Sequence, residues 1–251
     1  MLDWTRDINS KQWKTFIAAF LGWTLDAMDL LLYVFAFKFI AQSFDLNPTQ
    51  AAFLFSITLA SSALGGIVFG IISDYVGRIR ALTYSILIYS LFTMFSAFAP
   101  TIGFFIVCRF LLGLGMGGEW ASGEILVAES WPKQHRGKVV GMVQSGWGFG
   151  FILAAILATF VLPITSFNLN MLPFFDKDFP VESWRVLFFL GVLPALLVFY
   201  VRRVCEEPEI WRKSSVERNK TKQEFTLLQI FKGDLRPMLI KATLLTSFCM
   251  I

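Results

Sequence analysis

Six long apolar stretches dominate the pattern of hydrophobic and polar positions along the chain. A transmembrane helix needs about 20 predominantly apolar residues. The stretches that meet this requirement lie at about 15–40, 51–73, 82–100, 102–127, 139–163 and 184–201, and a seventh begins near Met238. Because lipid offers no partner to an unpaired peptide group, backbone at membrane depth must be helical. The pattern therefore predicts an all-α membrane protein.

Composition supports this fold class and excludes several others. Hydrophobic residues make up 56% of the 251 residues and charged residues 16%, whereas soluble domains have about 45–50% and about 25%. A soluble protein of this size could not bury so much apolar surface in one core. These values exclude a disordered chain, a disulfide-stapled secreted scaffold and an ordinary cytosolic enzyme.

No catalytic residues, metal site or cofactor are expected. The three cysteines, Cys108, Cys205 and Cys249, have no spacing that indicates a metal site or a disulfide framework. No nucleophile lies in an arrangement with a base. The net charge of +4 is attributed to cytoplasmic loops, so a nucleic-acid partner is not expected.

Basic residues indicate which side of the membrane each loop faces. With the N-terminus in the cytoplasm, 17 Lys and Arg residues fall in the inner segments 1–14, 74–81, 129–138 and 202–236, against three outside, Lys38, Lys177 and Arg185. Inner loops of membrane proteins carry such an excess. The sequence predicts a multi-pass protein of the inner (plasma) membrane with a cytoplasmic N-terminus, and the lack of organelle-targeting features favours a bacterial source.

The same pattern divides the chain into four parts. They are a cytoplasmic N-terminus at 1–14, a six-span bundle at 15–201, a cytoplasmic linker at 202–236 and a truncated seventh span at 237–251. A charged linker between a sixth span and a new apolar run is what joins two helical bundles. We therefore expect the chain to be the first half of a larger protein whose C-terminal half is its missing partner.

Two carboxyl groups lie in the middle of the first span. Asp26 and Asp29 are three residues apart, which places them on one helix face together with Gly22 and Tyr33. Each acidic residue costs about 2.5–3.5 kcal/mol at mid-membrane if it meets lipid. The pair is therefore expected to face the bundle interior or a water-filled cavity, where it carries a coupling proton or only bonds a neighbouring helix.

Arg109 is a third ionisable residue at membrane depth. It lies about 10 Å from the outer end of the fourth span, and Asp29 lies about 20 Å from the inner end of the first. In a hydrocarbon core about 30 Å thick these depths nearly coincide. Arg109 is expected to pair with an Asp, to bind an anionic substrate through its planar fork, or to be purely structural.

Further polar residues and glycines complete the candidate set. Tyr33, Gln144 and Trp147 either line a cavity or pack between helices. Small residues four apart let helices approach closely, so we assign Gly113, Gly117, Gly146 and Gly150 to helix packing. Glu119 and Glu124, toward the inner end of the fourth span, are expected to lie on a solvated face, with a functional site as the alternative, and His135 is expected to be solvated.

The motifs between the spans resemble those of the major facilitator superfamily. Gly70-Ile-Ile-Ser-Asp74-Tyr-Val-Gly77-Arg78 resembles its inner-loop signature G-x-x-x-D-(R/K)-x-G-R-(R/K), with Tyr75 and Ile79 in place of basic residues. The run from Arg109 to Trp120 resembles its fourth-span pattern, and 206–211 resembles the E-S-P-x-W motif after the sixth span. The chain is most similar to the proton symporters for sialic acid and aromatic acids, whose first span carries a D-x-x-D pair.

The resemblance implies a fold and a mechanism. The fold would be the six-helix N-terminal bundle of a major facilitator fold plus the start of a seventh span. The chain would belong to a secondary transporter in the lipid bilayer that takes up a small organic anion with a proton by alternating access. Asp26 and Asp29 would carry the proton, Arg109 would bind the substrate with Tyr33, Gln144 and Trp147, and a conformational latch would comprise Gly70, Asp74, Gly77 and Arg78.

Two other interpretations remain open at this point. One is a proton-independent facilitator or exchanger of the same superfamily. The other is a truncated product that does not transport, or a module that pairs with a second polypeptide.

Overall fold

The protein is described by a computed structural model that covers residues 7–164, 182–221, 236–237 and 240–241. Within these residues six helical segments are long and apolar enough to cross a membrane. They are Ser10–Ser43, Pro48–Val76, Arg78–Ala97, Ile102–Ser130, Lys133–Val161 and Ser183–Val204. The predicted order of six helical spans is confirmed. The predicted seventh span, at 237–251, lies almost wholly outside the described residues.

The first four spans are single helices and the last two are interrupted. The single helices are α1 (Ser10–Ser43), α2 (Pro48–Val76), α3 (Arg78–Ala97) and α4 (Ile102–Ser130). The fifth span consists of a short 3-10 turn, Lys133–His135, followed by α5 (Arg136–Gln144) and α6 (Gly146–Val161). The sixth consists of α7 (Ser183–Leu190) and α8 (Pro194–Val204). Pro194 has no N–H to donate to the preceding turn and suits the first turn of a new helix.

Local sequence decides where α1 and α2 begin. The side chain of Asn9 accepts a hydrogen bond from the backbone of Gln12 at 2.9 Å, and the side chain of Gln12 accepts one from the backbone of Asn9 at 2.8 Å. Asn47 and Gln50 form the same arrangement at the start of α2. Such a capping box satisfies two helix-end N–H groups at once. It starts α1 at Ser10, ahead of residue 15, where the predicted span begins.

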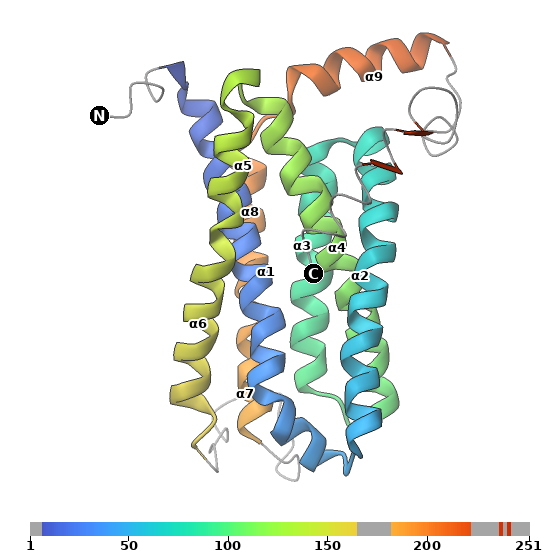
Figure 1. The fold of residues 1–251 in the computed structure, drawn as a ribbon, viewed down its shortest axis with the longest axis vertical. Coiled ribbons are helices and arrows are strands. Elements are labelled where there is room, and N and C mark those ends of the chain that lie inside the picture. Colours follow the sequence, from blue (N-terminus) through green and yellow to red (C-terminus); the bar gives the residue numbers. More distant parts are fainter. Residues whose placement is uncertain (1–6, 165–181, 222–235, 238–239, 242–251) are drawn as a thin grey trace. The chain divides into compact units, whose positions relative to one another are not determined.

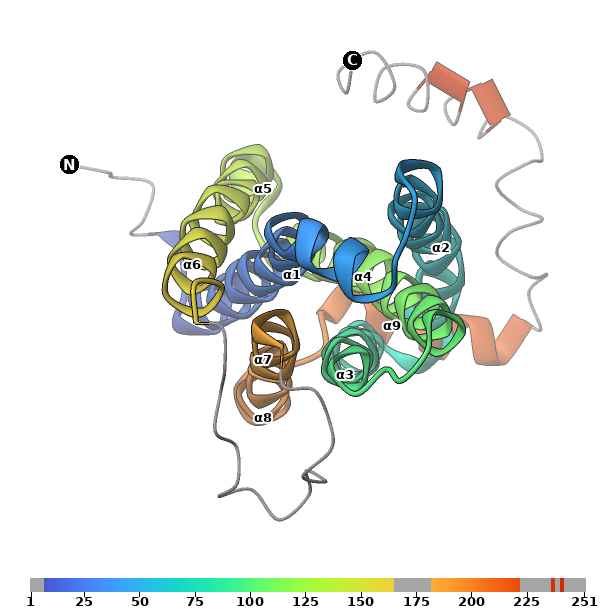
Figure 2. The same ribbon diagram turned by 90° about the horizontal axis from the view of Figure 1, so that it is seen from below.

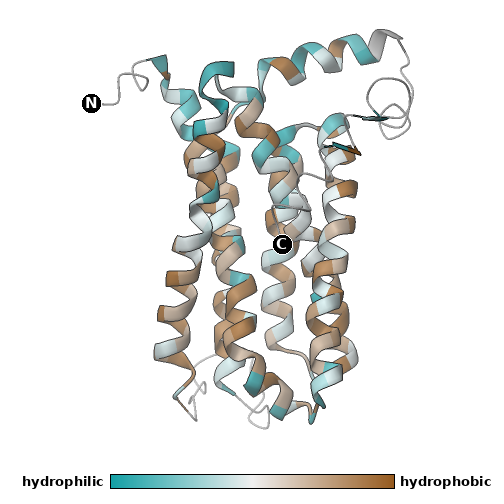
Figure 3. Ribbon diagram, viewed as in Figure 1, coloured by the Kyte–Doolittle hydropathy of each residue, from teal (hydrophilic) through white to brown (hydrophobic). Residues whose placement is uncertain are grey.

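The chain divides into two compact units, Met1–Trp211 and Arg212–Ile251. The first unit contains α1 to α8, which run roughly side by side along one axis (Figure 1). Hydrophobic residues occupy most of the helix lengths, and hydrophilic residues gather mainly at the helix ends (Figure 3). The helix α9 (Glu209–Thr221) begins in the first unit and continues into the second.

Within the first unit, α1 and α4 are the central helices of the bundle (Figure 2). α4 packs against α2 and α3, and α1 packs against α6. α1 and α4 also contact each other, so polar residues on their facing sides lie inside the bundle. These two helices carry the ionisable residues that the sequence singles out.

One expectation about the connecting segments is wrong. His135, predicted to be solvated, is 7% exposed. Its Nε2 lies 3.6 Å from Asp7 Oδ2 and 3.2 Å from the side-chain nitrogen of Gln134. The 3-10 turn folds the connecting segment back toward the residues before α1, which removes the imidazole from water.

Candidate functional site

Asp26 and Asp29 face the inside of the bundle. They are 2% and 0% exposed, respectively. The hydroxyl of Thr93 on α3 donates a hydrogen bond of 3.0 Å to Asp29 Oδ2. The other oxygen of Asp29, and Oδ1 of Asp26, have no hydrogen-bond partner among the described residues. The pair is therefore shielded from lipid and only partly satisfied by neighbouring helices.

Arg109 on α4 is enclosed close to this pair. It is 0% exposed, and none of its three guanidinium nitrogens has a hydrogen-bond partner in the described part of the chain. It lies near enough to Asp29 to attract its carboxylate, yet no direct ion pair joins them in the described structure. Arg109 and Asp29 are therefore both enclosed in the bundle, and the guanidinium donates no hydrogen bond within the described residues.

Aromatic rings surround the guanidinium. Its central carbon lies 4.1 Å from the ring centroid of Tyr33 and 5.9 Å from that of Phe188. The Tyr33 ring is parallel to that of Phe55, with centroids 6.0 Å apart. Cations are attracted to the faces of such rings. The rings hold the guanidinium in place without using any of its N–H donors.

Gln144 and Trp147 lie in a different part of the bundle from Arg109. The ring of Trp147 is 5.3 Å from that of Trp23, which precedes Tyr33 on α1 by about three turns, or roughly 15 Å along the axis. The side-chain amide of Gln144 donates to a carboxylate oxygen of Glu124. Of the four predicted substrate-binding residues, the structure brings Tyr33 and Arg109 together and places the other two nearer the start of α1.

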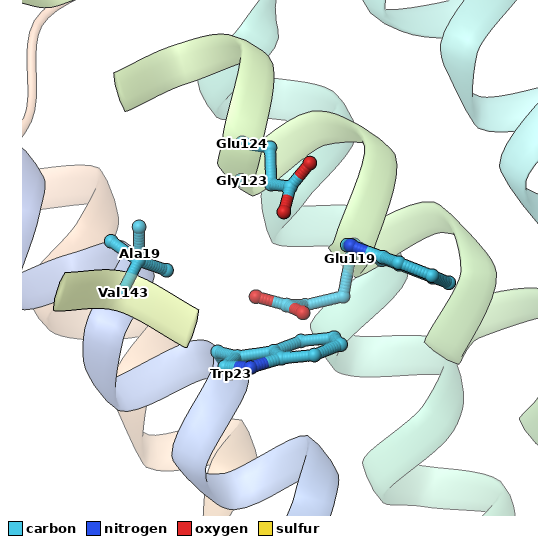
Figure 4. Close-up of a pocket in the computed structure, with 7 residues that line it drawn as sticks. Ala19, Trp23, Glu119, Gly123, Glu124 and Val143 are labelled. Carbon is cyan, nitrogen blue, oxygen red and sulfur yellow. The ribbon is translucent and has the colours of Figure 1, made fainter. Parts of the chain in front are cut away.

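A pocket lies in that second region. It is lined by residues from α1, α4 and α5, namely Ala19, Trp23, Glu119, Trp120, Gly123, Glu124 and Val143. The carboxylates of Glu119 and Glu124 both point into this space from α4, and Trp23 lies across from Glu124 (Figure 4). The pocket is therefore acidic on one side and aromatic on the other.

Glu119 is a buried residue that the sequence pattern does not reveal. Predicted to be solvated, it is 1% exposed. It lies between α1 and α4, where an added Cβ at Gly22 would come 2.5 Å from its Oε1. The available signal is an acidic residue within a glycine-rich run of an apolar span. The sequence does not say which face of α4 packs against α1, so this signal does not distinguish a buried carboxyl group from a solvated one.

Two of the four predicted latch residues, Asp74 and Arg78, form a hydrogen-bonded cluster with Glu129 near the turn between α2 and α3. Arg78 donates to Asp74 at 2.6 Å and, with two nitrogens, to the two oxygens of Glu129 on α4 at 2.7 and 3.1 Å. This is the two-pronged geometry that favours arginine over lysine. The cluster ties together the ends of α2, α3 and α4. Close packing does not require a glycine at Gly70, another predicted latch residue, because an added Cβ there would meet nothing within 4 Å.

Glu207, which follows α8, closes this cluster. Its carboxylate accepts hydrogen bonds from the backbone N–H groups of Arg78, at 2.8 Å, and Ile79, at 3.1 Å. It therefore caps the positive end of α3. Burial raises the pKa of the Glu207 carboxyl, and these backbone hydrogen bonds oppose the shift. Gly77 has φ +118°, and an added Cβ there would also collide with the Glu207 side chain, so glycine is required.

The four glycines assigned to packing lie at close helix contacts. An added Cβ at Gly113 or Gly117 would collide with backbone atoms of α2, at Thr58 and Ser62 respectively. One at Gly146 would meet Thr24 on α1, at 2.8 Å, and one at Gly150 would collide with the backbone of the same residue. Glycine lets these pairs of helices approach more closely than any other residue would.

Fold and site together define a multi-span membrane protein with ionisable groups enclosed in its helical bundle. The sequence model of the Major Facilitator Superfamily matches residues 15–251, and the chain belongs to this superfamily. The resemblance of its motifs to that family is confirmed. The matched family and relatives are transporters, in agreement with the prediction that the chain is not an enzyme.

Several relatives and solved structures are similar over most of the chain. The sialic acid transporter NanX of Escherichia coli is 31% identical over 229 residues, covering 91% of this chain and 51% of that protein. The probable 4-methylmuconolactone transporter of Cupriavidus pinatubonensis is 34% identical over 218 residues, covering 87% and 48%. A bacterial homologue of the human lysosomal transporter Spinster has a TM-score of 0.72 at 20% identity, covering 80% and 44%. The chain thus spans about half the length of the curated relatives it matches.

Proposed function

We propose that this chain is the N-terminal bundle of a transporter that takes up a small organic acid together with a proton. The observation that carries the proposal is the buried guanidinium of Arg109, whose N–H donors are unpartnered in the described structure. A buried charge without a partner is costly. A planar carboxylate is the group that best matches an arginine fork, so the substrate supplies the missing partner.

The coupling proton is carried by Asp29, with Asp26 beside it. A carboxyl group removed from water is more easily held in its neutral form, and a nearby arginine favours the charged form. Arrival of an anionic substrate at Arg109 weakens the attraction of the guanidinium for Asp29, which favours protonation of that carboxyl group. Substrate and proton are therefore bound together and released together.

Alternating access requires a second bundle that rocks against this one around the shared site. We place the domain boundaries at 15–201 for the bundle and 202–236 for the linker, with the N-terminus in the cytoplasm and the protein in a bacterial inner membrane. The cluster of Asp74, Gly77 and Arg78 acts as the latch at the inner face. Gln144 and Trp147 lie on the cytoplasmic part of the substrate pathway.

The relatives support an organic acid as the substrate. Those similar to this chain include a sialic acid transporter, a cis,cis-muconate transport protein and a niacin transporter. Each of these printed substrates carries a carboxyl group. The aromatic rings around Arg109 suit an acid that is flat or cyclic.

The test is uptake by the full-length protein encoded by the gene, reconstituted in liposomes. Radiolabelled sialic acid, cis,cis-muconate, niacin and benzoate are supplied with and without an inward pH gradient. We expect accumulation of at least one acid, driven by the gradient. Uptake that ignores the gradient would favour a facilitator or exchanger, and no uptake of any organic acid would contradict the proposal.

Asp29→Asn is expected to uncouple transport from the proton. A gradient of one pH unit is worth about 1.4 kcal/mol per proton, which sustains about tenfold accumulation of an acid carried with one proton. The amide of asparagine still accepts the hydrogen bond from Thr93 and cannot bind the coupling proton. The accumulation ratio should therefore fall to about one, measured as the plateau of uptake.

The matched control for this variant is Thr93→Val. It removes the hydrogen bond to Asp29 and leaves the carboxyl group in place. We expect the accumulation ratio to stay near its wild-type value. If the Asp29→Asn variant reached the wild-type accumulation ratio, Asp29 would not carry the coupling proton.

A further inference from the structure

The side chain of Glu119 fits between α1 and α4 because two neighbouring positions are glycines. An added Cβ at Gly22 on α1 would lie 2.5 Å from Glu119 Oε1, and one at Gly123 on α4 would lie 3.3 Å from the same oxygen. Any larger residue at Gly22 would push the carboxyl group away. The fold therefore makes specific room for an acidic side chain that is 1% exposed.

Among the described residues, no cation is found to interact with this carboxyl group. Its Oε2 has no hydrogen-bond partner among the described residues. The ionisable groups that interact electrostatically with it in the described structure are Asp26 from α1, Tyr89 from α3 and Glu124 from α4. None of them is a cation. Arg109 acts on Asp29 and Tyr33 instead. A buried carboxylate in such surroundings is costly, and a proton is the simplest way to neutralise it.

A metal ion is a poorer fit than a proton. Within the described residues no three acidic, histidine or cysteine side chains are grouped so that they could hold a metal. The acidic groups are instead arranged in sequence along the bundle. Asp29 and Asp26 are on successive positions of one face of α1, and Gly22, one turn further toward the start of that helix, contacts Glu119.

We propose that Glu119 is a transfer site for the coupling proton, between the Asp26–Asp29 pair and the pocket near the start of α1. This inference rests on the proposed function, and in the orientation proposed above that pocket faces the cytoplasm. In the transfer, neutral Glu119 first releases its proton to water in the pocket, so that its O–H bond breaks and it becomes a carboxylate. The proton of Asp29 passes to the Asp26 carboxylate. The O–H bond on Asp26 then breaks as an O–H bond forms on Glu119, which is neutral again, and the negative charge remains on Asp29.

A transfer site affects the rate of coupled transport and not its driving force. In Glu119→Gln, the initial rate of gradient-driven uptake by the full-length protein in liposomes should fall about tenfold or more. The final accumulation ratio should still reach the wild-type value, in contrast to Asp29→Asn. Exchange of labelled for unlabelled acid at equal pH on both sides should be unchanged, because exchange requires no net proton release. Glu119→Asp should recover part of the initial rate.

The matched control is Glu209→Gln, an exposed carboxyl group at the start of α9, which should keep the wild-type rate. Gradient-driven uptake by Glu119→Gln at the wild-type initial rate would overturn the inference and leave the proposed function intact. A wild-type protein that ignores the gradient would instead contradict the proposed function itself.

A second measurement needs no transport. Infrared difference spectra of the purified full-length protein, recorded across a pH change, should contain the carbonyl bands of buried protonated carboxyl groups. One of these bands should be lost in Glu119→Gln and kept in Glu209→Gln. If all carboxyl bands persist unchanged in Glu119→Gln, Glu119 does not bind and release a proton, even when that variant fails to transport.

Discussion

Replacing Arg109 with methionine is expected to abolish substrate binding and at the same time to stabilise the bundle. Two charge-assisted hydrogen bonds from the guanidinium to a carboxylate are worth about 1.5–3 kcal/mol each. At about 1.4 kcal/mol per factor of ten, their loss weakens binding by at least about 100-fold. The measurement is equilibrium binding of labelled sialic acid or cis,cis-muconate to the full-length protein, using the acid that the wild type accumulates.

The stability of the same variant should change in the opposite direction. Arg109 is fully buried and its guanidinium has no hydrogen-bond partner in the described structure. A buried charge without a hydrogen-bond partner is costly, and an apolar residue at this position removes that cost. We expect a higher unfolding temperature for Arg109→Met in detergent without substrate. A large loss of stability would instead mean that Arg109 is a structural residue.

The Arg109→Lys variant tests the positive charge separately from the planar, two-pronged geometry of the guanidinium. Lysine keeps the positive charge and cannot make two parallel hydrogen bonds to one carboxylate. We therefore expect binding about tenfold weaker than wild type, between wild type and methionine. Equal binding by the lysine and wild-type proteins would show that only charge is needed at this position.

Gly117→Ala is expected to be the most damaging of the conservative changes at helix contacts. The added Cβ would collide with the carbonyl oxygen of Ser62 and lie 2.7 Å from the backbone nitrogen of Gly66, both on α2. Backbone atoms cannot turn aside as a flexible side chain can, so α2 and α4 must separate. Overpacking of this kind costs about 1–3 kcal/mol or more, measured as a fall in unfolding temperature and in the yield of folded protein.

Gly141→Ala on α5 is the matched control and should have the opposite sign. An added Cβ there meets nothing within 4 Å, and the position is exposed. Alanine is favoured over glycine inside a helix by about 1 kcal/mol. We therefore expect a small gain in stability. If the two variants were equally stable, close approach of α2 and α4 would not depend on Gly117.

The sequence predicts how far along its span a residue lies better than it predicts which other residues it contacts. The rise per residue is constant in a helix, so the positions of Asp29 and Arg109 along their spans follow from residue numbers alone. The structure places Arg109 against Tyr33, one turn beyond Asp29 on α1. The same reasoning does not predict the burial of Glu119, because that burial depends on which face of α4 packs against Gly22 of α1.

The sequence by itself determined that the chain crosses the membrane six times within its described part and carries acidic and basic groups inside its bundle. The bilayer imposes that result, since a span must be about 20 apolar residues long and helical. Tertiary structure alone decided which polar groups share a space, joining Tyr33 to Arg109 and Glu119 to the Gly22 face of α1, and placing Trp147 against Trp23. Which side of one helix faces another depends on how side chains and glycines pack between them, and no single helix contains that information.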